Sequence, residues 1–110
     1  MSTILNIRDP KSSNLPVMQS NLIQSSDETR VYSLDLSDFT SPTTPVVTAK
    51  NMSTEQVATS SVVTVGGAIV GTDLTFTISN LQAINRYKID MKFTSTTEII
   101  EPYLILDCNS

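Results

Sequence analysis

Apolar and polar residues alternate with a period of two along three runs between Asp73 and Cys108. Successive side chains of a β-strand point to opposite faces of its sheet, so this pattern predicts strands with one face in a core and one face in water. The stretch 73–108 is therefore predicted to organise an all-β domain. The apolar positions of the three runs are Leu74, Phe76 and Ile78; Tyr87, Ile89, Met91 and Phe93; and Ile100, Leu104, Leu106 and Cys108.

Shorter runs upstream of residue 73 complete the predicted strands. Arg30–Leu36 alternates in the same way, with Tyr32, Leu34 and Leu36 on one face. Weaker strands are predicted at 46–50, with Val47 and Ala49 on one face, and at 60–65 and 68–70. About seven short strands at close spacing are typical of an antiparallel Greek-key β-sandwich, which is the fold that we expect.

Turn signals separate these strands. Gly66-Gly67 is predicted to be a hairpin turn, because glycine adopts positive φ at little cost. The pattern nowhere has the 3.6-residue period of a helix, and 82–85 has room for one helical turn at most. The other predicted turns and loops lie at 38–45, at 51–54 and at Gly71.

Residues 1–28 have a different pattern, in which apolar residues are scattered among Ser, Asn and Gln and are interrupted by Pro10 and Pro16. The apolar content is too high for a purely solvating tail. Two interpretations are open. Residues 1–28 form an extended arm that docks on a neighbouring subunit and precedes a sandwich domain at 29–110, or they form a first strand and loop of that same domain. The apolar residues of this segment are Leu5, Ile7, Leu15, Val17, Met18, Leu22 and Ile23.

Composition narrows the classes of function. A chain of 110 residues is one domain in length. Its net charge of −4 argues against binding to nucleic acid or to an anionic membrane, since both require a basic surface. The single cysteine excludes an intramolecular disulfide. No apolar run reaches the length of about 18 residues that a membrane-spanning helix needs, and the first residues lack the pattern of a secretory signal.

Few residues of this chain are candidates for catalysis or metal binding. Without histidine, neither a Ser-His-Asp nor a Cys-His arrangement can be built, and one cysteine does not make a zinc site. Cys108 has the inward parity of Leu106 and is expected to be a core residue. Composition permits a paired-carboxylate site, but the carboxylates lie on polar faces or in turns. We therefore predict no enzyme activity, no cofactor and no metal. The carboxylates considered are Asp35, Asp38, Asp73, Asp90, Glu98, Glu101 and Asp107.

The spacing of Leu81, Ala83 and Tyr87 resembles the tyrosine corner of immunoglobulin-like and fibronectin type III sandwiches. In that corner a leucine ends one strand, and a tyrosine at the start of the next strand hydrogen-bonds through its hydroxyl to nearby backbone. The alternative is an ordinary core tyrosine at a strand start.

A longer pattern covers about residues 28–108. DETRVYSLDLSDF is followed by a middle rich in Val and Thr, then by a glycine-containing turn, and finally by RYKIDMKFTSTTEIIEPYLIL. This order resembles the small immunoglobulin-like virion proteins of tailed bacteriophages, in particular the fibre–tail adaptors, although SNLQAIN stands where that family often has glycine-rich turns. The matching positions are Tyr32, Leu34, Asp35, Leu36, Tyr87, Ile89, Met91, Phe93, Thr94, Glu101, Leu104 and Leu106.

The resemblance implies a structural protein of the virion, assembled in the host cytoplasm, which connects tail or neck with fibres and acts as a symmetric homo-oligomer with other virion proteins. Contacts are expected from the apolar residues of 1–28 and from Tyr103 and Ile105, whose parity is opposite to that of Leu104. A last strand that is apolar on both faces is either covered or part of an interface. A capsid decoration or cement protein is one alternative, and a free-standing module that binds carbohydrate or peptide is another.

Overall fold

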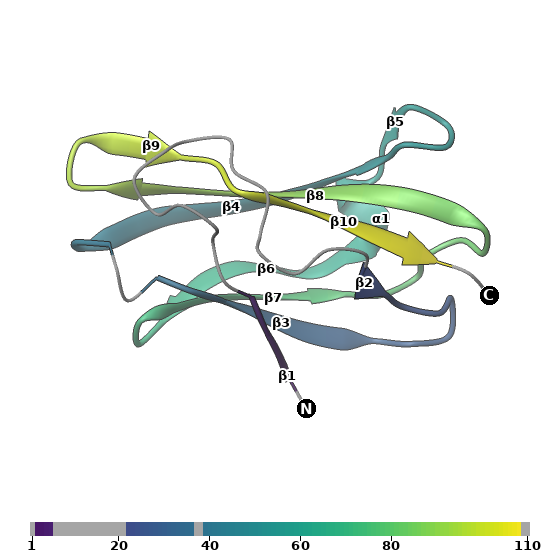
Figure 1. The fold of residues 1–110 in the computed structure, drawn as a ribbon, viewed down its shortest axis with the longest axis horizontal. Helices are drawn as coiled ribbons and strands as arrows, with labels where there is room; N and C mark the ends of the chain where they lie inside the picture. The colour runs from purple at the N-terminus through teal and green to yellow at the C-terminus, as the bar shows by residue number, and fades with distance from the viewer. Residues whose placement is uncertain (1, 6–21, 37–38, 109–110) are drawn as a thin grey trace.

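The computed structural model describes residues 2–5, 22–36 and 39–108, and these fold into two β-sheets that face each other (Figure 1). One sheet has the strand order β1-β3-β7-β6, and the other has the order β2-β10-β8-β4-β5, with β9 also paired to β8. The described residues are therefore mainly β, as predicted. The elements are β1 (Ser2–Leu5), β2 (Leu22–Ile23), β3 (Arg30–Asp35), β4 (Pro42–Asn51), β5 (Gln56–Val57), α1 (Thr59–Val62), β6 (Val63–Val70), β7 (Asp73–Ile78), β8 (Asn85–Ser95), β9 (Glu98–Ile100) and β10 (Tyr103–Cys108).

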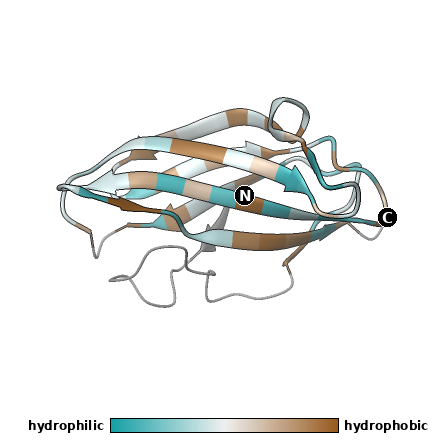
Figure 2. Ribbon diagram, turned by 90° about the horizontal axis from the view of Figure 1, so that it is seen from above, coloured by the Kyte–Doolittle hydropathy of each residue, from teal (hydrophilic) through white to brown (hydrophobic). Residues whose placement is uncertain are grey.

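The core lies between the two sheets and consists of the positions whose parity predicted it. All eleven apolar residues of the three C-terminal runs are buried, as are Tyr32, Leu34, Leu36, Val47 and Ala49. Figure 2 shows hydrophobic and hydrophilic residues alternating along the strands. Each fully buried aliphatic or aromatic side chain contributes about 1.5–3 kcal/mol of transfer free energy, so this interleaved layer is the main source of stability.

Strand β4 begins earlier than predicted. The region 38–45 is predicted to be a loop, but residues from Pro42 onward pair with β8, which is long enough to extend the ladder to Ser95. The register shifts between Thr43 and Val46, and Thr44 has a positive φ of 55° in this bulge. The turn-forming sequence SPTTP is therefore accommodated as a bulged strand rather than as a free loop.

The predicted strand at 60–65 is wrong over its first part, because residues 59–62 form the helical turn α1 and β6 starts at Val63. The cause is a contact with the edge of β4. The hydroxyl of Thr59 accepts a hydrogen bond from the Ala49 N–H at 2.9 Å and donates one to the Ala49 carbonyl at 3.3 Å. The Ala58 N–H also donates to that carbonyl, at 2.8 Å. The turn thus satisfies backbone groups that β4 would otherwise expose at its edge.

The predicted turn at Gly66-Gly67 is also wrong, since both glycines lie inside β6. The pairing of β6 with β7 shifts in register between Val65 and Ala68, so the glycines form a bulge in a strand. The turn comes later, at Gly71, which has the positive φ of 61° that favours glycine. Residues 82–84 form no helix, within the limit of one helical turn expected there, and β8 begins at Asn85.

The described parts of the N-terminal segment belong to the two sheets of their own chain. Strand β1 pairs in parallel with β3, and β2 pairs in parallel with the end of β10, where Leu22 is the partner of Leu106. Leu22 packs against the core. The structure thus has strands at 2–5 and 22–23, while docking of residues 1–28 on a neighbouring subunit stays a prediction. Four candidate contact residues, Ile7, Leu15, Val17 and Met18, lie outside the described residues.

Candidate functional site

A corner connects β7 to β8 and carries the chain from one sheet to the other. Leu81 is buried in this corner, Ala83 is exposed, and the ring of Tyr87 is buried at the start of β8. The Tyr87 hydroxyl accepts a hydrogen bond of 2.9 Å from the backbone N–H of Gln82. The polar atom of the buried ring is therefore paired with the backbone that turns around it.

Replacing Tyr87 with phenylalanine is expected to lower the free energy of unfolding by about 1 kcal/mol, because the N–H of Gln82 loses its acceptor. Urea unfolding followed by circular dichroism measures the change. Tyr103→Phe is the matched control, since Tyr103 lies on the outer side of the sandwich and keeps part of its surface exposed. Equal stability of Tyr87→Phe and the wild-type protein would contradict a structural role for the hydroxyl.

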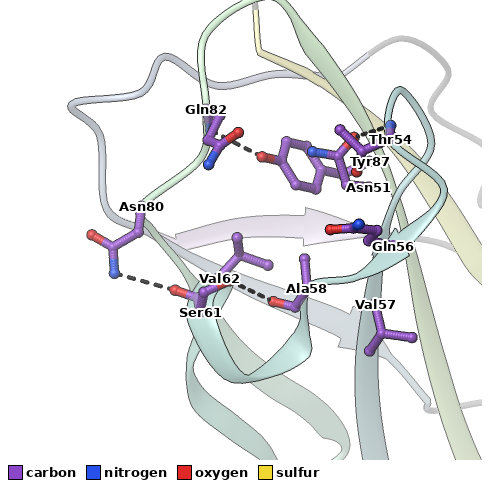
Figure 3. A pocket seen from close by; sticks show the side chains of 10 residues that line it. All are labelled: Asn51, Thr54, Gln56, Val57, Ala58, Ser61, Val62, Asn80, Gln82 and Tyr87. Atoms are coloured by element: carbon purple, nitrogen blue, oxygen red, sulfur yellow. Dashed lines mark hydrogen bonds between the residues drawn. The ribbon is translucent and has the colours of Figure 1, made fainter.

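A pocket of about 200 Å³ opens beside this corner (Figure 3). Its wall is uncharged and rich in carboxamides. Asn51 accepts hydrogen bonds from the N–H groups of Ser53 and Thr54 and so holds the turn at the pocket rim, while Asn80 donates to the Ser61 carbonyl. The pocket can offer hydrogen bonds to a neutral polar ligand, but no charged group for acid–base chemistry. The lining residues are Asn51, Thr54, Gln56, Val57, Ala58, Ser61, Val62, Asn80, Gln82 and Tyr87.

Gln24 links the two sheets through its fully buried side chain. Its Nε2 donates to the carbonyls of Ile78 and Glu28, both at 2.9 Å, and its Oε1 accepts from the Tyr32 hydroxyl at 2.8 Å. Its backbone N–H donates to the carbonyl of Asp107 on β10. One residue beside β2 is thus bonded to β10 in one sheet and to β3 and β7 in the other. The sequence pattern did not predict that Gln24 is buried and links the sheets. The one indication of its burial is that Gln24 has the inward parity of Leu22.

Burial raises the pKa of Tyr32 to about 12. The ionised phenol is therefore disfavoured in the folded state, and the stability that this group contributes is complete below its unfolded pKa of about 10 and lost as pH rises towards 12. We expect the free energy of unfolding to fall by up to about 2 kcal/mol more between pH 9.5 and 11.5 in the wild-type protein than in Tyr32→Phe. Urea unfolding of both proteins at the two pH values checks this, and parallel losses would contradict it.

The outer face of the six-stranded sheet carries two ion pairs, one between β8 and β10 and one within β8. Arg86 and Asp107 form an ion pair of 2.7 Å, and Lys88 lies 3.8 Å from Asp90 and over the ring of Tyr103, with 4.7 Å from Nζ to the ring centre. Burial raises the pKa of Asp90, and Lys88 opposes that shift. A hollow of about 310 Å³ lies on this face between Lys50, Met52, Glu55, Lys88 and Asp90.

The predicted contact residues in the described part of the chain have different environments. Ile23 is exposed, whereas Leu22 packs against the core of its own chain. Tyr103 and Ile105 point away from the core, as predicted, and are half-buried on the outer face of β10. Their neighbours across the strand pair are Asp90 and Lys88. For Leu5 the structure describes only the place in β1.

The described residues contain no group of three His, Cys, Asp or Glu side chains that could hold a metal ion, and Cys108 is buried. Within the same residues, no helix is long and apolar enough to cross a membrane. No family model, curated protein or solved structure matches the chain.

Proposed function

We propose that this chain is a non-catalytic structural protein that joins other proteins through the outer faces of its two sheets. The observation that carries the proposal is a well-filled core combined with large apolar side chains that remain exposed on both outer faces. Val31, Val65 and Val70 are 40–62% exposed on the four-stranded sheet, and Val46 and Ile99 are 44% and 54% exposed on the six-stranded sheet. Apolar surface that the core does not need, bordered by polar residues, is typical of protein–protein contact sites.

The strand order supports an immunoglobulin-like sandwich. If β1, β3, β4, β6, β7, β8 and β10 are read as strands A to G, the sheets have the orders ABED and CFG. The hydrogen bond between Tyr87 and the backbone of Gln82 suits a tyrosine corner at the connection from E to F. One departure is that β1 runs parallel to β3, although neighbouring strands of such sandwiches are antiparallel.

We propose that, as a structural protein, the chain belongs to the virion of a tailed bacteriophage, where it connects tail or neck to fibres. The resemblance of 28–108 to fibre–tail adaptors supports this position. In a symmetric particle each contact is repeated, so weak individual contacts add up to a stable junction. A capsid decoration protein would use the same faces and is the alternative within the class.

Peptide binding at the polar pocket is a second candidate function. The uncharged, carboxamide-rich wall around Asn51, Gln56 and Asn80 suits an extended backbone, which offers alternating donors and acceptors. The pocket suits carbohydrate less well than peptide, because the one aromatic residue of its wall, Tyr87, is 1% exposed and cannot stack on a sugar ring.

Particle composition tests the proposed function. We expect the chain to co-purify with phage particles through density gradients at a fixed copy number per particle, measured by quantitative mass spectrometry against a capsid protein. Absence from purified particles would contradict the virion role. Saturable binding of a peptide by a monomer, with chemical-shift changes confined to the pocket, would instead favour the second candidate.

A further inference from the structure

Asn51, the last residue of β4, places an almost fully buried carboxamide in the wall of the polar pocket. Its side chain has the inward parity of Val47 and Ala49 and is 5% exposed. Its Oδ1 accepts the N–H groups of Ser53 and Thr54 at 2.9 and 3.1 Å. These two hydrogen bonds fix the orientation of the carboxamide, so a ligand that contacts it need not order a mobile side chain.

The nitrogen of this carboxamide, Nδ2, has no hydrogen-bond acceptor among the described residues. In the same part of the chain, every fully buried side-chain nitrogen or oxygen does have a partner. Nδ2 of Asn51 therefore reaches open space, and the open space that Asn51 lines is the pocket of about 200 Å³. A fixed donor without a protein acceptor is available to an acceptor atom of a ligand.

Three further carboxamides complete the polar wall. Gln56 lies on β5, whereas Asn80 and Gln82 come from the corner between β7 and β8 (Figure 3). Asn80 donates through Nδ2 to the Ser61 carbonyl and keeps its Oδ1 as an acceptor. Gln82 accepts from Asn85 through Oε1 and keeps its Nε2 as a donor. The wall thus presents donors and acceptors together, and none of its residues is charged.

We propose that this pocket binds the carboxamide side chain of a glutamine or asparagine on a loop of a partner protein. A carboxamide carries an acceptor oxygen and a donor nitrogen on one flat group. The oxygen can accept from Asn51 Nδ2 while the nitrogen donates to an acceptor such as Asn80 Oδ1. A charged side chain would lose its hydration without meeting an opposite charge, and an aliphatic one would leave Asn51 Nδ2 unpaired.

The size and rim of the pocket suit a protein loop. Its volume of about 200 Å³ is below the roughly 300 Å³ at which pockets for small-molecule ligands begin, so it fits a single side chain. Val57 lines the pocket and is 82% exposed, so an aliphatic residue beside the carboxamide can cover it. This inference deepens the candidate function of peptide binding, on which it rests, by naming the side chain that is recognised.

Blocked tetrapeptides test the ligand class on the wild-type chain. Acetyl-Ser-Gln-Val-Ser-N-methylamide is titrated into isotope-labelled protein and followed by two-dimensional amide NMR. We expect saturable shifts of the side-chain amide signals of Asn51 and of the backbone signals around the pocket. Peptides with leucine or glutamate in place of the glutamine are expected to bind at least about tenfold more weakly, because one leaves a donor unpaired and the other buries a charge.

Asn51→Asp tests the donor itself, since aspartate keeps the oxygen that holds the turn and replaces Nδ2 with a second acceptor. We expect this variant to fold, as checked by circular dichroism, and to bind the glutamine peptide at least about tenfold more weakly than the wild-type chain. Thr97→Asp adds the same charge in the turn between β8 and β9, at the end of the sandwich away from β5 (Figure 1). This control should bind the peptide as the wild-type chain does.

The glutamine peptide binding no better than the leucine or the glutamate peptide would overturn the carboxamide inference, as would unchanged affinity in a folded Asn51→Asp variant. If that variant does not fold, the peptide series on the wild-type chain decides. Peptides that shift pocket signals without this selectivity would leave peptide binding standing, whereas no shift of any pocket signal would contradict both. Particle composition tests the virion role separately from these results.

Discussion

Replacement of Gln24 with leucine is expected to lower the free energy of unfolding by about 2–4 kcal/mol. Leucine is similar in size, so the loss comes from polar groups rather than from a cavity. The Tyr32 hydroxyl loses its acceptor, and the buried carbonyl of Ile78 loses its donor. Groups that remain buried without partners cost more than an average hydrogen bond contributes. Urea unfolding followed by circular dichroism or tyrosine fluorescence measures the change, because the chain has no tryptophan.

Two comparisons separate this effect from a general loss of a polar side chain. Gln56→Leu makes the same substitution at an exposed position of β5 and is expected to change stability by less than about 0.5 kcal/mol. In a double-mutant cycle, Tyr32→Phe should cost about 1 kcal/mol less in the Gln24→Leu background than alone, since its partner is already gone. A Gln24→Leu protein as stable as the wild type would show that the inter-sheet link carries no stability.

Replacement of Gly67 with alanine is expected to cost about 1–3 kcal/mol, because a methyl group there overfills the core. An ideal Cβ at Gly67 would lie 2.8 Å from Cγ2 of Val47, and Pro45 and Leu74 close the space at 3.5 and 3.6 Å. Valine cannot readily turn away, since its χ1 is restricted and Val47 is buried. The backbone of β6 or the side chain of Val47 has to move, and thermal unfolding reports the resulting loss as a lower Tm.

Gly66 is the matched control for this experiment. It is the neighbouring residue in the same bulge, a Cβ there would have open space within 4 Å, and its φ is not in the left-handed region. Gly66→Ala is expected to be neutral or stabilising by up to about 1 kcal/mol, because alanine restricts the unfolded chain. In a Val47→Ala background the cost of Gly67→Ala should shrink. Equal effects of the two glycine substitutions would contradict the close approach of β6 to β4.

The set of side chains on each outer face of the sandwich depends less on the local sequence pattern than the strands do. The outward parity of Tyr103 and Ile105 could be predicted because parity follows from neighbouring residues alone. The grouping of Lys50, Lys88 and Lys92 on one face could not be predicted, because these residues share a face only when β4 pairs with β8. Which residues gather on one side of a sheet depends on strand order, and strand order is a property of the whole fold.

The period-two pattern between Asp73 and Cys108 was sufficient to predict β7, β8 and β10 and the residues that fill the core, although Ile100 of the third run belongs to the separate strand β9. It is sufficient because the alternation of side chains is built into an extended backbone and needs no partner. The Gly66-Gly67 bulge, the helical turn at Thr59 and the link through Gln24 depend instead on Val47, Ala49 and Tyr32, which belong to other strands. Two glycines suit a turn as well as a crowded strand, and a glutamine suits water as well as a core, until folding supplies the neighbours that select between them.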